Sequence, residues 1–292
     1  REGTTSGAYN PPGFERIDNG LTRFHPYAEQ IRTYDGVIVG LIDGKLWRLN
    51  SQTATWEVVR EDLDSYLLKL DPEVIHNSDE YSLDGGTTWK PLPEIGDSDG
   101  SSILVSMGTS LFATVHVYVY SEGEARDGQI WTIDLADRTP TWILQTESTL
   151  NEYGIYDLTP IPAANTLVRS WWEGDDDGMQ LELSTDSGIT FDALESPCSW
   201  SFYAHANGIY CKGEDGSVQW YDLTTQAWST ITTESGDMLV ESNRPRDELY
   251  VVRDSTFMKI ATDGSETILT SLGDDSGRYP RIFFLEDSII MS

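Results

Sequence analysis

A strand hairpin recurs along the chain and limits the fold more than any other feature of the sequence. Each copy starts with an Asp-Gly pair, runs into a short strand, crosses a polar turn and reaches a further tryptophan. The copies span 43–47, 127–131 and 215–220, and the tryptophans that follow them are Trp56, Trp142 and Trp228. A unit repeated in this way indicates a domain assembled from copies of one small sheet. Almost no segment has a sustained helical period, so we expect an all-β chain.

The spacing of the repeat predicts the number of sheets. The residues that open each predicted outer strand are Trp56, Trp89, Trp142, Phe191, Trp228 and Ile268. Their mean interval of about 42 residues suits four short strands and their turns. Two further strands are expected at 281–284 and 288–291, and one more at 14–17. We therefore predict a single domain, residues 1–292: a β-propeller of seven four-stranded blades, closed by pairing the N- and C-terminal strands in one blade. Six or eight blades, paired β-sandwiches and a solenoid are the alternatives.

Two octapeptides match the pattern Ser-x-Asp-x-Gly-x-Thr-aromatic. Their pattern residues are Ser82, Asp84, Gly86, Thr88 and Trp89 in one, and Ser184, Asp186, Gly188, Thr190 and Phe191 in the other. Both resemble the Asp-box, or bacterial neuraminidase repeat, of sialidases, xyloglucan-degrading enzymes, sortilin-type receptors and photosystem assembly factors. The resemblance implies a structural hairpin away from the catalytic face. In it the Asp binds turn amides, the Gly permits the turn and the aromatic packs between sheets.

Enzymatic activity finds little support in the sequence. Sialidases of this group also carry a Phe/Tyr-Arg-Ile-Pro signature, whereas here residues 14–17 (Phe-Glu-Arg-Ile) are followed by Asp18. Other glycosidases need a pair of carboxylates, and spacing cannot single out a pair among 49 acidic residues. Asp71, Asp157 and Glu241 follow strand-like residues near aromatics and are the candidates. Surface or turn positions are the alternative for all three.

The charge of the chain restricts its partners and its environment. It has 49 acidic against 19 basic residues, a formal net charge of −30. Nucleic acid and anionic membranes require a basic surface, so neither is expected as a partner. An acidic, lysine-poor surface suits a halophilic, marine or extracellular setting. We expect an extracellular, periplasmic or cell-surface protein whose signal peptide has been removed, without membrane insertion.

One segment combines aromatic and acidic residues. Trp171 and Trp172 precede a loop in which Glu173, Asp175 and Asp177 alternate as in a cation loop. Adjacent strand residues point to opposite faces, so one tryptophan is a candidate for stacking on a sugar. The three carboxylates are candidate ligands for calcium, the one cofactor considered. Core packing of both tryptophans and a solvated hairpin tip are the alternatives.

The remaining chemistry-bearing residues show no further site. The four histidines lack metal-binding spacing, and nucleotide, zinc or haem motifs are absent. Cys198 and Cys211 can form a disulfide or stay as buried thiols. A turn at 206–208 would place Cys211 opposite a residue near Tyr203, rather than opposite Cys198.

These observations favour a secreted or cell-surface binding module without enzymatic activity, which recognises a glycan or a protein through its loops. Ten tryptophans and the acidic surface support this reading. The first alternative is an Asp-box-type glycoside hydrolase with a carboxylate pair at the central channel. The second is an assembly or scaffold factor. Fold alone does not separate the three.

Overall fold

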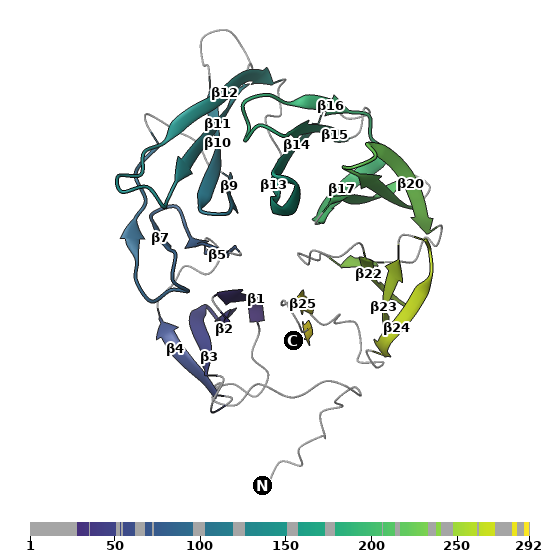
Figure 1. Cartoon of the computed structure of the whole chain (residues 1–292), viewed down its shortest axis with the longest axis horizontal. Helices are drawn as coiled ribbons and strands as arrows, with labels where there is room; N and C mark the ends of the chain where they lie inside the picture. The colour runs from purple at the N-terminus through teal and green to yellow at the C-terminus, as the bar shows by residue number, and fades with distance from the viewer. Residues whose placement is uncertain are drawn as a thin grey trace.

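The chain forms antiparallel sheets arranged around a centre (Figure 1). The computed structural model describes residues 28–271, together with 282–284 and 289–291. Within the first range the gaps are 35, 51–52, 54, 62–67, 72, 96–102, 119–125, 151–156, 173–178, 206, 214–216, 233–237, 241–247 and 262. Among these residues the only helix is the short 3-10 helix η1 (Pro162–Ala164). The described residues therefore include no helix that is long and apolar enough to cross a membrane.

The described residues build six four-stranded blades, numbered here in chain order. Blade 1 holds β1 (Ala28–Tyr34), β2 (Val37–Ile42), β3 (Lys45–Asn50) and β4 (Thr55–Arg60). Blade 2 holds β5 (Lys69–Leu70), β6 (Ile75–His76), β7 (Glu80–Ser82) and β8 (Lys90–Pro91). Blade 3 holds β9 (Ile103–Met107), β10 (Ser110–Tyr118), β11 (Arg126–Asp134) and β12 (Ile143–Leu150).

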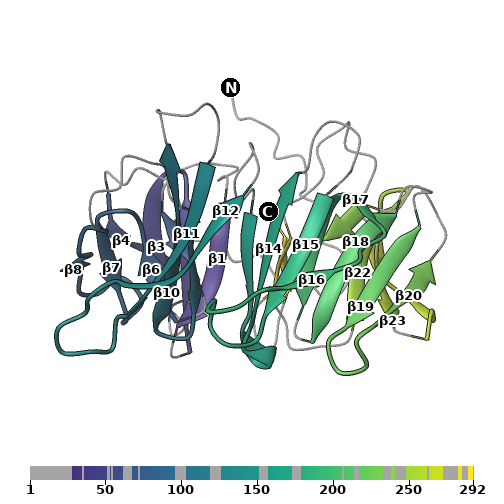
Figure 2. The same ribbon diagram turned by 90° about the horizontal axis from the view of Figure 1, so that it is seen from above.

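The second half of the chain repeats this arrangement. Blade 4 holds β13 (Asp157–Ile161), β14 (Thr166–Trp172), β15 (Met179–Ser184) and β16 (Asp192–Leu194). Blade 5 holds β17 (Cys198–His205), β18 (Gly208–Gly213), β19 (Val218–Asp222) and β20 (Ala227–Thr232). Blade 6 holds β21 (Met238–Val240), β22 (Glu248–Arg253), β23 (Thr256–Ala261) and β24 (Glu266–Ser271). Figure 2 shows the sheets side by side around the ring.

The predicted count of seven blades is corrected to six. The C-terminal strands β25 (Ile282–Phe284) and β26 (Ile289–Met291) form where they were expected, but as a two-stranded sheet. β25 lies against β1, between blades 6 and 1 (Figure 1). The strand expected at 14–17 lies outside the described residues, so the structure does not show the predicted closure of the ring. Without that strand, the C-terminal pair is not a four-stranded blade.

The aromatic marks predicted to open the outer strands have the expected places. Trp56 and Trp228 lie near the start of β4 and β20, and Ile268 lies in β24. Trp89, Trp142 and Phe191 stand immediately before β8, β12 and β16. The period of about 42 residues is thus one blade, and every outer strand starts close to its mark.

The Asp-Gly pairs behave differently from one repeat to the next. Asp43 and Gly44 form a two-residue turn with positive φ at both positions, 51° and 73°. In contrast, Asp127 and Gly128 are paired within β11, so the turn predicted there is wrong. β10 and β11 are nine residues long, and their hairpin extends beyond the Asp-Gly pair. The third pair, at 215–216, lies outside the described residues.

The core lies between neighbouring blades, because each sheet buries alternate residues on its two faces. In β15, Met179 and Leu181 are buried while Gln180 and Glu182 are partly exposed. Tryptophans of the repeat add hydrogen bonds across the gap between blades. Nε1 of Trp142 donates to the carbonyl of Pro93 at 2.7 Å, and Nε1 of Trp228 donates to the carbonyl of Glu195 at 2.8 Å. Each acceptor follows the outer strand of the preceding blade.

A disulfide joins Cys198 in β17 to Cys211 in β18. His205 pairs with Gly208 across the hairpin, close to the turn predicted at 206–208, and Cys211 lies opposite Phe202, next to the predicted Tyr203. Cys198 pairs with Gly213, and Phe202 pairs with Cys211. Between these two pairs β17 advances by four residues, whereas β18 advances by only two. The extra residues form a bulge, and they leave the two cysteine Cα atoms 5.5 Å apart, within the range of a disulfide. A register without this bulge would have kept them apart.

Candidate functional site

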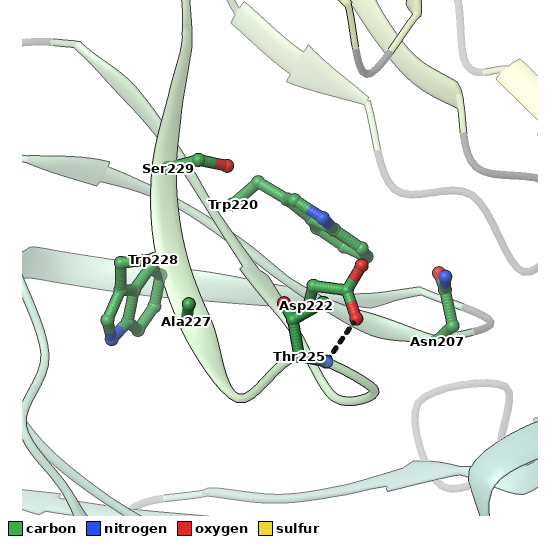
Figure 3. A pocket seen from close by; sticks show the side chains of 7 residues that line it. All are labelled: Asn207, Trp220, Asp222, Thr225, Ala227, Trp228 and Ser229. Atoms are coloured by element: carbon green, nitrogen blue, oxygen red, sulfur yellow. Dashed lines mark hydrogen bonds between the residues drawn. The ribbon is translucent and has the colours of Figure 1, made fainter.

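A pocket of about 280 Å³ opens at the end of blade 5 where the β17–β18 and β19–β20 turns lie (Figure 3). The side chains that line it belong to Asn207, Trp220, Asp222, Thr225, Ala227, Trp228 and Ser229. They come from the two turns, from the end of β19 and from the start of β20. The volume suits one sugar ring or one side chain of a partner.

Strand pairing explains why these residues meet. Asp222 pairs with Gly208 on one side and with Ala227 on the other, and Trp220 pairs with Ser229. Residues two apart on a strand share a face, so Trp220 and Asp222 point to the same side of the blade. The β17–β18 turn then places Asn207 beside them.

Trp220 forms the floor of the pocket. Its side chain is only 3% exposed, and its ring lies 4.3 Å from that of Tyr210. The ring also covers Gly208, where an added Cβ would come within 2.1 Å of Trp220 Cη2. Glycine at 208 is therefore required for the tryptophan to lie flat against the turn. The resulting floor is apolar and rigid.

Asp222 places a carboxylate at the wall of the pocket. Its Oδ1 accepts hydrogen bonds from the backbone amides of Thr224 at 2.7 Å and Thr225 at 3.0 Å. This Asx turn shapes the β19–β20 connection and fixes the side chain. Among the described residues, Oδ2 accepts no hydrogen bond, and it lies toward Trp220 (Figure 3). The carboxylate thus has one oxygen in the turn and one available for a ligand.

Asn207 supplies the second polar group. Its backbone carbonyl accepts from the amide of Leu223, which joins the two turns at 2.9 Å. Its side-chain Oδ1 is buried and has no hydrogen-bond partner among the described residues. A buried acceptor without a donor is costly, by about 1–3 kcal/mol. The amide is therefore suited to accept a hydrogen bond from a bound group.

A second polar cluster ties three blades together at their inner strands. Nε2 of His76 and Oδ2 of Asp71 are 2.8 Å apart, and the same oxygen accepts the amide of Ser106 at 3.1 Å. The hydroxyl of Tyr34 donates to the carbonyl of Asp71 at 2.5 Å. Gln30 extends the tie, because its side-chain amide bonds the backbone of residues 68 and 70. These contacts join β1, β5, β6 and β9.

The protonation of this cluster favours a structural role. Desolvation by burial raises the pKa of Asp71, but the hydrogen bond and charge of His76, the hydrogen bond of Ser106 and the charge of Arg32 together outweigh it and lower this pKa. Burial raises the pKa of Tyr34, so its hydroxyl stays a donor at neutral pH. Asp71, one of the predicted carboxylate candidates, is thus held as an anion. An acid catalyst needs the opposite shift.

The first octapeptide that resembles an Asp-box, residues 82–89, forms a turn in which Asp84 binds backbone amides, as the resemblance implies. Ser82 donates to Oδ1 of Asp84 at 2.8 Å and accepts the amide of Gly86 at 2.9 Å. Thr88 donates to Asp84 through its amide at 2.8 Å and its hydroxyl at 2.7 Å. Trp89 closes the turn by donating from Nε1 to the carbonyl of Gly86 at 2.9 Å. Desolvation by burial raises the pKa of Asp84, but the hydrogen bonds from Thr88, Ser82 and the amide of Thr87 together outweigh it and lower this pKa.

The second Asp-box repeats this geometry. Ser184 donates to Oδ1 of Asp186 and accepts the amide of Gly188, both at 2.8 Å. Thr190 donates to Asp186 through its amide at 2.9 Å and its hydroxyl at 2.6 Å. The two bonds from Thr190 are the largest cause of a pKa of about 2 for Asp186. Phe191 takes the place of the tryptophan.

An arginine covers the aromatic ring of each Asp-box, which the motif did not predict. Cζ of Arg60, from the outer strand of blade 1, lies 4.6 Å from the centre of the Trp89 ring. Cζ of Arg169, in blade 4 itself, lies 4.2 Å from the centre of Phe191. Arg169 is buried and also bonds Glu182. Each aromatic is therefore held by a cation–π contact in addition to its packing.

The tryptophan and calcium candidates remain predictions. Trp171 is half-buried in β14, and Arg169 lies over its ring at 5.8 Å. Trp172 ends the same strand, and its side chain is outside the described part. Glu173, Asp175 and Asp177 also lie outside it. Where the structure is described, no group of three His, Cys, Asp or Glu side chains is placed to hold a metal.

The other two carboxylate candidates stay predictions. Asp157 starts β13 and accepts the hydroxyl of Thr159 at 3.1 Å. Glu241 lies outside the described residues. The pocket residues Asn207 and Asp222 were missed, because Asn-Gly and Asp-x-Thr read as ordinary turn signals. Only the pairing of β18 with β19 brings the two turns together.

Comparison with known proteins bears on the fold alone. No protein-family model matches the chain, and no curated protein matches its sequence. It is similar to PorZ, an essential bacterial surface component of the type-IX secretion system of Porphyromonas gingivalis, at 14% identity and a TM-score of 0.55. The match covers 94% of this chain and 36% of PorZ. The fold is a β-propeller.

Two peptidase structures resemble the propeller as well. A prolyl endopeptidase matches at 12% identity and a TM-score of 0.55, over 83% of this chain and 41% of the enzyme. The acylaminoacyl peptidase of Pyrococcus horikoshii matches at 12% identity and a TM-score of 0.50, over 84% of this chain and 46% of that one. The propeller thus spans less than half the length of each of the three proteins. Its neighbours include enzymes and a surface component, so the likeness assigns no activity.

Proposed function

We propose that this propeller is a binding module without enzymatic activity, which holds a polar group of a glycan or protein in the blade 5 pocket. The observation that carries the proposal is the pocket itself. It joins a tryptophan floor to a carboxylate that a turn fixes, and to an amide oxygen without a hydrogen-bond partner among the described residues. An apolar surface with a few placed polar groups is the usual composition of a recognition site.

The carboxylates favour binding over hydrolysis. A glycoside hydrolase keeps one carboxylic acid protonated by a raised pKa. Among the described residues, four carboxyl groups have a pKa below the ordinary value: Asp71, Asp84, Asp186 and Asp263. Hydrogen bonds from turns and neighbouring strands stabilise these groups as anions. This supports scaffolding and recognition roles for the acidic residues.

The proposal includes a secreted or cell-surface location and a kinship with Asp-box propellers. The Cys198–Cys211 disulfide supports the location, because disulfides persist in oxidising compartments. The two hairpins support the kinship, since both repeat the same network of Ser, Asp, Gly and Thr hydrogen bonds. The net charge of −30 adds support for a hydrated, solvent-facing protein.

Filling the pocket tests the proposal. Ala227 is exposed on β20 and lines the pocket, so Ala227→Tyr should block it without disturbing the core. Ala193 is exposed on β16, the outer strand of blade 4, and Ala193→Tyr is the matched control. Each protein is screened against glycan and peptide arrays. We expect ligands of the wild type to be retained by the control and lost, by about tenfold or more, in Ala227→Tyr. Equal binding by both variants would place recognition elsewhere.

A further inference from the structure

The blade 5 pocket presents an excess of hydrogen-bond acceptors. Oδ2 of Asp222 accepts no bond among the described residues, and Oδ1 of Asn207 has no partner. Ser229 adds a hydroxyl at the exposed rim. The lining contains no Lys or Arg side chain that would neutralise the carboxylate. A ligand that only donates hydrogen bonds would satisfy these groups best.

The surrounding charge favours a cation in this position. The chain carries a net charge of −30, so a bound cation is attracted before it reaches the pocket. Several described cations are already held by acidic partners, in the pairs Lys45–Glu61, Arg60–Glu80, Arg169–Glu182 and Arg253–Glu266. Within the described part of the chain, Asp222 has no such partner. Its charge is therefore available to a group from outside.

The geometry selects between the two common organic cations. A guanidinium binds a carboxylate best through two parallel hydrogen bonds to both oxygens. Here Oδ1 of Asp222 already accepts the amides of Thr224 and Thr225. One oxygen remains, and it suits the compact charge of an ammonium, which donates three hydrogen bonds to separate acceptors. Asn207 can supply a second acceptor, because its Oδ1 has no hydrogen-bond partner among the described residues.

We infer that the pocket binds a primary ammonium group, held by Asp222 and Asn207 against the Trp220 floor. The inference rests on the proposed function and names the chemistry that this pocket recognises. A lysine side chain of a protein and an amino sugar both carry such a group. The negative charge of the protein attracts the ammonium group of either source in the same way.

Titrations of the full 292-residue chain with small probes test the inference. Nα-acetyl-lysinamide and glucosamine present the amine, and Nα,Nε-diacetyl-lysinamide and N-acetylglucosamine present the same skeletons without it. Nα-acetyl-argininamide presents the guanidinium. Amide chemical shifts of Asn207, Thr225 and Ser229 report on occupancy. We expect saturable shifts from the amines at low salt, at least about tenfold weaker binding of their acetylated forms, and weaker binding of the guanidinium. The stronger amine identifies the source.

Two variants with opposite expected effects complete the test. Asp222→Asn keeps an oxygen for the turn amides and removes the charge, and we expect amine affinity to fall about tenfold. Asn207→Asp adds a charge, and we expect affinity to rise about threefold or more. Asp137→Asn and Asn165→Asp make the same charge changes at exposed positions in blades 3 and 4. These controls should bind within about twofold of the wild type if local contacts dominate.

The outcomes separate this inference from the proposed function. Binding of amines that is unchanged in Asp222→Asn would show non-specific attraction to an acidic surface and overturn the inference. If the acetylated probes bind as tightly as the free amines, the inference is overturned as well. That result would instead indicate a neutral ligand for the same pocket. Failure of every probe, with array ligands blocked by Ala227→Tyr, would reject the ammonium and keep the binding module. Failure of both experiments would reject the module at this site.

Discussion

Two turn positions of the Asp-boxes have different requirements at the residue scale. In the first box φ is 65° at Gly85 and 85° at Gly86, and in the second it is 62° at Ser187 and 85° at Gly188. The serine shows that the earlier position accepts a side chain in the left-handed region. The later position is more restricted. A Cβ on Gly86 would lie 2.5 Å from Cδ2 of the buried Leu46 in blade 1.

Substitution of the two glycines should therefore differ in cost. For Gly86→Ala we expect a loss of about 2–4 kcal/mol in the free energy of unfolding, from the left-handed φ and the contact with Leu46. For Gly85→Ser, which copies the second box, we expect a loss below about 1 kcal/mol. Urea denaturation followed by tryptophan fluorescence measures both. Similar losses of stability in the two variants would mean that blade 1 accommodates the added methyl group at position 86 without a cost in free energy.

At the scale of the element, each Asp-box hairpin depends on an ionised aspartate. Donors from Ser184, Ile189 and Thr190 hold the pKa of Asp186 at about 2, below the value of about 3.9 expected in the unfolded chain. A depressed pKa stabilises the fold fully above the unfolded value, and this contribution is lost as the pH falls through the folded value. The aspartate thus supports the hairpin down to about pH 4 and progressively less toward pH 2.

The variant Asp186→Asn should reveal this dependence. We expect it to be less stable than the wild type at pH 7, and the difference in free energy of unfolding to shrink between pH 4 and pH 2. Urea denaturation at pH 7, 4 and 2 measures it, with Asp137→Asn as the control for a charge lost at an exposed turn. A difference that stays constant over this range would indicate that the amide fails for steric reasons, rather than for lack of charge.

Individual elements show what the sequence could and could not predict. The outer strands and Asp-box hairpins were predictable, because their aromatics and turn residues act locally and repeat. The turn at Asp127 was not, since the pairing of β10 with β11 continues through it. Bonding of Cys198 to Cys211 depends on a bulge, and bulges leave no clear sequence signal. The pocket depends on two turns that meet only through strand pairing, so Asn207 and Asp222 looked like ordinary turn residues.

At the scale of the whole molecule, the arrangement of blades concentrates negative charge. The chain has a net charge of −30. The propeller holds the charged residues of its described blades close together, whereas an unfolded chain spreads them over a larger volume. Repulsion therefore opposes the folded state more than the unfolded one. Salt reduces this repulsion, since the Debye length falls from about 30 Å at 0.01 M to about 3 Å at 1 M. Ion pairs such as Arg60–Glu80 are short and partly buried, and they lose less to screening.

Stability should consequently rise with sodium chloride at neutral pH. Between 10 mM and 1 M we expect the Tm to increase by about 5 °C or more, because relief of repulsion outweighs weakening of the exposed ion pairs. Calorimetry at pH 7 measures the change, and the same series near the isoelectric point of about 4.2 is the control. Near that pH the net charge is small, so most of the salt effect should disappear. An equal rise at both pH values would point to a general effect of salt on hydration, independent of the acidic surface.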